Sequence, residues 1–84
     1  MGEIRVKLYG ALCLIPEVKK DKDRIKNGVP MIINEPTNVR DALKLLDIPI
    51  KNVNIVCIGK DQVMLDKELK DGDILHVFPI MGGG

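Results

Sequence analysis

Residues 37–49 read Thr-Asn-Val-Arg-Asp-Ala-Leu-Lys-Leu-Leu-Asp-Ile-Pro, and this stretch decides the class of fold. Its apolar residues recur at i, i+3, i+4 and i+7, the spacing of an amphipathic helix: Val39, Ala42, Leu43 and Leu46. Thr37 or Asn38 can cap the start of this helix, and Pro49 prevents its continuation. The sequence therefore predicts one helix of about two and a half turns with a single apolar face.

The segments on both sides of this helix have the patterns of strands. In the first segment Ile4, Val6 and Leu8 alternate with polar residues, which is typical of a half-buried strand, and Gly10 closes it. Short apolar segments bounded by turn residues predict further strands at 31–34, 53–58, 63–65 and 74–78. One helix and four or five strands must share one core, so we expect an α+β fold with the helix across one face of a mixed sheet.

Length and composition exclude several classes of protein. The chain has 84 residues, of which 45% are hydrophobic and 30% charged, which is typical of one folded domain. A net charge of +1 and only two aromatic residues, Tyr9 and Phe78, argue against a nucleic-acid-binding surface. The longest apolar run, residues 11–15, is far shorter than the roughly 18 residues that a membrane span needs. Residues 1–10 lack the apolar core of a secretory signal, so we expect a cytoplasmic protein with reduced cysteines.

Residues 17–26 are the least regular part of the chain. They carry five basic and three acidic side chains and hold the basic excess of the whole sequence. We expect a solvated excursion between two strands; the alternative is a docking patch for an acidic partner.

Side chains that could act in catalysis are few. His76 is the only histidine, and alternation with Leu75 and Val77 predicts a surface or partly buried position on the opposite face of its strand. Cys13 and Cys57 lie in apolar segments and are expected to be small core residues. Neither cysteine has the spacing of a Cys/His nucleophile pair or of a zinc site.

Asp71 and Asp73 flank Gly72, which is the composition of a hairpin turn rather than of a paired acid and base. We therefore expect no complete active site in the chain, no bound cofactor and no metal ion.

Residues 80–84 are expected to form a flexible tail after a domain at 1–79, because glycines lose the most entropy on ordering. Pro79 cannot donate a hydrogen bond to a sheet, so the last strand should end near Phe78. A slim glycine tail can enter a narrow channel in another protein and present its carboxylate there. That carboxylate needs activation, for example as an acyl adenylate made by an ATP-using partner, before a nucleophile can attack it.

The run at 71–84, Asp-Gly-Asp-Ile-Leu-His-Val-Phe-Pro-Ile-Met-Gly-Gly-Gly, resembles the C-terminus of the ubiquitin-like sulfur carriers of the MoaD/ThiS family. Members typically show an acidic-Gly-Asp turn, an apolar strand, Phe-Pro or Phe-Gln, two apolar residues, a small residue and Gly-Gly. Gly82 is the small residue here, and Gly83 and Gly84 are the diglycine. The resemblance extends through the helix to the opening strand and is weakest at 11–30.

This resemblance implies a β-grasp fold and a terminal Gly84 that is adenylated and then converted to a thiocarboxylate, which delivers sulfur. The implied partners are a ubiquitin-activating-type enzyme that uses ATP, a sulfur donor protein and the large subunit of molybdopterin synthase. Gly82 and Gly83 would thread the partner's channel. The implied partner-binding residues at the base of the tail are Phe78, Pro79, Ile80 and Met81.

Several alternatives stay open. Phe78-Pro79 and the chain length favour molybdenum or tungsten cofactor synthesis, whereas a thiamin-thiazole sulfur carrier is the second pathway. A ubiquitin-like modifier conjugated through Gly84 would pass through the same adenylate. A plain β-grasp binding module would make no use of the tail. Phe78 itself is either an exposed anchor for a partner or a core aromatic.

Overall fold

The computed structural model describes residues 2–14, 18, 22–34 and 36–80, and these form five strands, two α-helices and two short 3-10 helices. The strands are β1 (Gly2–Leu8), β2 (Val29–Ile33), β3 (Val53–Ile58), β4 (Asp61–Val63) and β5 (Ile74–Pro79). The helices are η1 (Gly10–Leu14), α2 (Lys22–Asn27), α3 (Val39–Leu45) and η2 (Ile50–Asn52).

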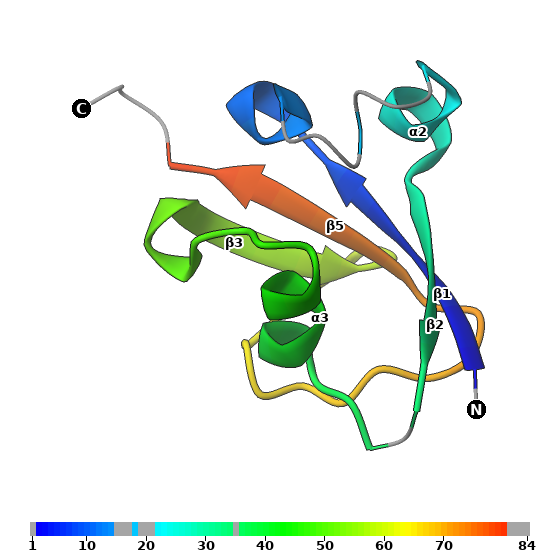
Figure 1. Cartoon of the computed structure of the whole chain (residues 1–84). Coiled ribbons are helices and arrows are strands. Elements are labelled where there is room, and N and C mark those ends of the chain that lie inside the picture. The colour runs from blue at the N-terminus through cyan, green and yellow to red at the C-terminus, as the bar shows by residue number, and fades with distance from the viewer. Residues whose placement is uncertain (1, 15–17, 19–21, 35, 81–84) are drawn as a thin grey trace.

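The strands form one mixed sheet in the order β2-β1-β5-β3-β4. β1 and β5 are parallel, whereas the other neighbouring pairs are antiparallel. The first and last strands therefore lie side by side at the centre, and α3 lies across one face of the sheet (Figure 1). The predicted α+β class, mixed sheet and single main helix are confirmed, and this is the arrangement of a β-grasp fold.

The start of α3 is fixed by a reciprocal pair of hydrogen bonds. The Asn38 side chain accepts a hydrogen bond from the backbone N–H of Asp41 at 2.8 Å, and the Asp41 carboxylate accepts one from the Asn38 N–H at 3.4 Å. This capping box satisfies backbone donors that the helix itself leaves without partners. Of the two predicted caps, Asn38 is the one that acts.

The core lies between α3 and the sheet face that it covers. Val39, Ala42 and Leu43 of α3 are fully buried there. The other buried apolar residues come from the strands and connections: Ile4, Val6, Leu8, Leu12, Val18, Val29, Ile33, Leu46, Ile48, Val56, Leu69, Leu75 and Val77. Because alternate residues of β1 and β5 enter this core, the residues between them lie on the opposite, outer face of the sheet.

The predicted turn at 71–73 forms, but it joins β1 instead of linking two neighbouring strands of a hairpin. The Asp73 carboxylate accepts a hydrogen bond from the backbone N–H of Lys70 at 2.8 Å. Gly72 donates its N–H to the carbonyl of Glu3, and the Asp71 carboxylate accepts the Glu3 N–H, each at 2.8 Å. The two aspartates thus stabilise backbone structure, as expected.

The charged stretch at 17–26 differs from the prediction. Its end forms α2, whose exposed side chains include Asp23 in the first turn and Lys26 in the last, an order that the helix dipole favours. The Asn27 side chain donates to the Asp23 carboxylate at 2.5 Å, which adds an i, i+4 contact. Val18 is buried, so the stretch is anchored to the core and is not wholly solvated.

The strand ends also differ by a few residues. β2 begins at Val29, and β4 lies at Asp61–Val63, earlier than the predicted strands at 31–34 and 63–65. β5 continues to Pro79, one residue beyond the predicted end. The register of β3 and β5 shifts between Val53 and Ile55, and this irregularity falls where the proline lacks an N–H.

Candidate functional site

The end of β5 presents the aromatic residue that the sequence predicts as a partner contact. Leu75 and Val77 are fully buried beneath α3, so His76 and Phe78 lie on the outer face of the sheet. Both outer-face side chains are partly exposed. Phe78 is therefore absent from the core, which supports the anchor alternative over the core alternative.

Tyr9, which directly follows β1, packs against this end of β5. The parallel register puts Lys7 beside His76 and Leu8 beside Val77, and the Tyr9 N–H donates to the Val77 carbonyl at 3.2 Å. The Tyr9 and Phe78 rings are stacked, with centroids 4.5 Å apart and planes at 11°. We call Tyr9, His76 and Phe78 the outer platform, because their rings form one continuous half-exposed surface.

A hydrogen bond between Tyr9 and His76 holds two side chains of the platform together. The Tyr9 hydroxyl lies 2.8 Å from Nδ1 of His76, and the centroids of the two rings are 5.9 Å apart. Partial burial, together with the positive charge of Lys7, lowers the pKa of His76 below its usual value. The lowered pKa favours the neutral imidazole at neutral pH, and in the tautomer that carries its proton on Nε2, Nδ1 accepts a hydrogen bond from the Tyr9 hydroxyl.

Charged and sulfur groups flank the platform. Lys7 places its Nζ 5.7 Å from the centroid of the Tyr9 ring, within reach of a cation–π attraction. Cys57 is the register partner of His76 on the other side, and it is a free, partly exposed thiol. The prediction of a core position for Cys57 is wrong, because its neighbour Val56 points into the core and alternation turns Cys57 outward. The side chain of Cys13 lies outside the described part of the structure.

The tail begins immediately after the platform. Pro79 is the register partner of Val53, and the Ile80 N–H donates to the carbonyl of Asn52 at 3.1 Å. The Ile80 side chain is 55% exposed, as an apolar partner contact requires. Four predicted site residues lie outside the described residues: Met81, Gly82, Gly83 and Gly84. The structure thus brings Phe78, Pro79 and Ile80 together at the end of β5, and the roles of all seven predicted site residues stay predictions.

Two contributors to this region were missed by the sequence reasoning. The sequence patterns place Tyr9 and Gly10 only in the opening strand and at its end, yet the Tyr9 ring stacks on Phe78, and a Cβ atom built on Gly10 would lie 2.9 Å from Cγ of Pro79. A usable signal exists in the sequence, because each of the only two aromatic residues directly precedes a Gly or Pro at a strand end. The cross-strand pairing itself needs the parallel register, which local patterns do not contain.

The platform offers binding surface and hydrogen-bonding groups rather than a nucleophile paired with a base. Among residues 2–14, 18, 22–34 and 36–80, no three His, Cys, Asp or Glu side chains gather where they could hold a metal ion. What the arrangement can do is bind another protein through aromatic and apolar contacts at the base of the tail.

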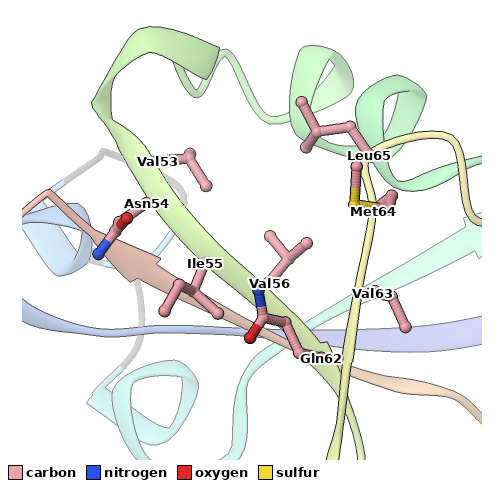
Figure 2. Close-up of a pocket in the computed structure, with 8 residues that line it drawn as sticks. All are labelled: Val53, Asn54, Ile55, Val56, Gln62, Val63, Met64 and Leu65. Atoms are coloured by element: carbon pink, nitrogen blue, oxygen red, sulfur yellow. The ribbon is translucent and has the colours of Figure 1, made fainter.

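A separate apolar groove of about 180 Å³ lies on the far side of β3 from β5 (Figure 2). It opens between β3 and the chain from Gln62 to Leu65, where β4 ends and the chain leaves the sheet edge. Its lining holds the amides of Asn54 and Gln62 among apolar side chains and no titratable group. The groove is therefore distinct from the platform and offers no chemistry of its own.

Comparison with protein families matches residues 17–84 to the model described as the ThiS family. No curated protein sequence matches the chain significantly. No helix in the described part of the chain is long and apolar enough to cross a membrane.

Solved structures share the fold at low sequence identity. A protein provisionally described as molybdopterin converting factor, subunit 1, from Pyrococcus furiosus aligns with a TM-score of 0.69 and 22% identity, covering 94% of this chain and 98% of that one. SAMP1 from Haloferax volcanii aligns with a TM-score of 0.69 and 20% identity over 99% of this chain and 100% of that one. A further structure from H. volcanii, of small archaeal modifier protein 1, aligns with a TM-score of 0.69 and 19% identity, covering 94% of this chain and 98% of that one.

Proposed function

This chain belongs to the ThiS family, and from that premise we propose that it is a sulfur carrier whose chemistry takes place at the carboxyl group of Gly84. An ATP-using activating enzyme joins this carboxylate to AMP and releases pyrophosphate. A sulfide-equivalent nucleophile from a sulfur donor protein then attacks the acyl carbon, and AMP leaves. The product is a thiocarboxylate, which delivers its sulfur to an acceptor in a larger enzyme. ATP binds to the partner and not to this chain.

One structural observation supports the proposal: the half-exposed aromatic platform lies directly before the tail in the chain. Phe78 is stacked on Tyr9, so it remains on the outer face without collapsing into the core. Ile80 adds exposed apolar area next to it. Aromatic anchors of this kind dominate the binding energy of many protein interfaces. A binding surface at the base of the tail suits a carrier whose reactive group lies at the end of that tail. The family match extends through Gly84, which supports the same reading.

Within this function, we favour synthesis of the molybdenum or tungsten cofactor, with the chain acting as the small subunit of molybdopterin synthase. The Phe78-Pro79 pair supports this choice, and the name of the P. furiosus structure agrees with it. The thiamin-thiazole pathway is the alternative for the same chemistry. The H. volcanii structures carry the name of a modifier, which makes conjugation of Gly84 to a lysine the second candidate function.

The first experiment is the intact mass of untagged protein purified from its own host. We expect a chain that ends at Gly84, with a fraction in which one oxygen is replaced by sulfur and which is absent when Gly84 is deleted. Heavier conjugates with a diglycine remnant on target lysines would instead favour the modifier.

A variant with one alanine added after Gly84 tests whether the terminus is the reacting group. The added residue displaces the carboxylate and places a methyl group next to it in a narrow channel, so activation should be lost. Full activation of this variant would overturn the proposal, and loss of activation with unchanged binding to the activating enzyme would support it. Transfer of sulfur by the loaded carrier to a pterin or a thiazole precursor, measured side by side, separates the two pathways.

Phe78→Ala tests whether Phe78 contacts the partner proteins. We expect this change to weaken the complex with the activating enzyme or the synthase subunit by more than about 1 kcal/mol, or roughly fivefold in Kd, because a buried aromatic anchor is lost. Isothermal titration calorimetry measures the effect. Ile74→Ala is the matched control, since Ile74 is 45% exposed on the same strand and face but lies at its other end. Equal effects of the two substitutions would refute the assignment of Phe78.

A further inference from the structure

Lys7 borders the outer platform on its β1 side. The parallel register sets Lys7 directly beside His76, and the Lys7 Nζ lies 5.7 Å from the centroid of the Tyr9 ring. On the other side of His76 its register partner is Cys57 of β3, which is not charged as a thiol. Lys7 therefore brings a positive charge to the edge of an aromatic surface.

The rest of the sheet does not neutralise this charge. In the described part of the chain no acidic side chain forms an ion pair with Lys7. β3 and β5 contain no acidic residue. Glu3, the acidic residue of β1, lies four positions before Lys7, which is about 13 Å along a strand. Physiological salt screens most of the attraction between exposed charges at that distance.

A protein that packs on the aromatic rings also changes the surroundings of Lys7. The Tyr9 and Phe78 rings are stacked with centroids 4.5 Å apart, so a surface that covers both comes next to the ammonium group and displaces its water. Burial of an unpaired charge is strongly unfavourable, whereas a carboxylate within hydrogen-bond distance compensates for the lost water. His76 offers a second donor in the same place, because its Nδ1 is engaged by Tyr9 and its Nε2 lies at the outer end of the ring.

We propose that the activating enzyme docks on the outer platform with an Asp or Glu carboxylate placed against Lys7, beside an apolar pocket that receives Phe78. This inference rests on the proposed function, and the sulfur carrier and the modifier both require such an enzyme. Apolar contacts alone discriminate poorly between partners. A positive charge at the edge of the contact disfavours every partner that lacks a matching carboxylate, so Lys7 contributes specificity.

Isothermal titration calorimetry of the carrier variants with the host's activating enzyme, without ATP, measures this contribution. We expect Lys7→Gln to weaken Kd about tenfold, and Lys7→Arg, which keeps the charge, to stay within about threefold of the wild type. Lys44→Gln is the matched control, since it removes the same charge from an exposed position on α3, which covers the opposite face of the sheet. It should change Kd by less than about twofold. Equal losses in Lys7→Gln and Lys44→Gln, or in Lys7→Gln and Lys7→Arg, would overturn the inference.

Zero-length coupling with a carbodiimide identifies the carboxylate itself. The reagent activates a carboxylate of the enzyme, the Lys7 amine attacks the acyl carbon to form an amide, and the reagent leaves as a urea. We expect peptide mapping of the complex to find Lys7 joined to one Asp or Glu of the enzyme. Lys7→Glu should then lose binding, and a second substitution of that enzyme residue by Lys should restore it to within about tenfold of the wild type. A complex in which Lys7 is never coupled, or a charge exchange that restores nothing, would overturn the inference.

The outcomes separate this inference from the proposed function. Binding and coupling are measured without ATP, so a chain that binds through Lys7 but is never adenylated would refute the sulfur-carrier function and support the docking surface. Adenylation with unchanged Kd in Lys7→Gln would refute the role of Lys7 and leave the carrier function intact. A chain that forms no complex with the activating enzyme would refute both.

Discussion

The surroundings of His76 favour its neutral form, and this makes the stability of the fold depend on pH. Partial burial first, and the charge of Lys7 second, lower the pKa of the folded imidazole below the value of about 6.5 that it has in an unfolded chain. Below pH 6.5 the unfolded chain therefore binds more protons at this site than the folded one. The contribution of His76 to stability is complete above that pH and is lost as the pH falls through the folded pKa.

Two measurements check this expectation. NMR titration of the ring protons should give a pKa below 6.5, and Lys7→Gln should raise it toward the ordinary value. Urea unfolding at pH 7 and pH 5 should show a smaller loss of stability at the lower pH in His76→Gln than in the wild type. A folded pKa at or above 6.5 would contradict the account.

Asp47 is a second residue whose environment predicts a measurable change. It is the one described residue other than glycine with a positive φ, at 58°, and it follows the C-terminal end of α3. Asp47→Gly should raise the free energy of unfolding by about 1 kcal/mol, because glycine adopts this conformation without steric cost. Asp47→Asn separates this effect from the removal of a negative charge at the helix C-terminus, since asparagine keeps the Cβ atom. Equal gains from both substitutions, measured by denaturant unfolding, would assign the effect to charge.

At the scale of elements, α3 depends on its cap. Asn38→Ala removes the side chain that accepts the Asp41 N–H, and we expect a loss of about 1 kcal/mol in the free energy of unfolding. Asn38→Ser, which restores an acceptor, should recover most of that loss. Thermal and urea unfolding of the two variants would show the difference, and equal stabilities would mean that the cap contributes nothing.

Most elements could be predicted because each has a local signature. Alternation of Ile4, Val6 and Leu8 identified β1, and the helical spacing around Leu43 identified α3. α2 has no such signature: its sequence is mostly charged, and it is held by local hydrogen bonds and by the neighbouring β1 and β2. Patterns that describe only burial cannot detect a helix of this kind.

The candidate site was predictable only in part for a related reason. Phe78, Pro79 and Ile80 could be proposed as site residues from the sequence because they are consecutive and precede a family motif. Tyr9 and Gly10 belong to the site only through the parallel pairing of β1 with β5, which joins residues almost seventy positions apart. No local pattern contains that register, and the outward position of Cys57 depends on the same sheet geometry.

At the scale of the whole molecule, the sheet order predicts how stability is distributed. β1 and β5 have neighbouring strands on both sides, whereas β2 and the three-residue β4 lie at the edges. We expect hydrogen-bonded amides of β1 and β5 to exchange with solvent only through global unfolding, and those of β4 to exchange through smaller openings. Native-state hydrogen exchange at increasing denaturant would test this, and faster exchange in β5 than in β4 would contradict it.

Because β5 lies at the centre of the sheet, the fold and the platform can form only after this strand has been synthesised. Ile74–Pro79 is synthesised after β1 and β3, yet both of these strands need it as the strand between them. A nascent chain that stops before this segment leaves two strands without their shared neighbour and the core residues Leu75 and Val77 missing. Unfinished chains therefore cannot complete the fold, and they also lack the platform. A partner that binds folded Phe78, as we propose, would therefore select chains that contain β5 without any separate quality-control step.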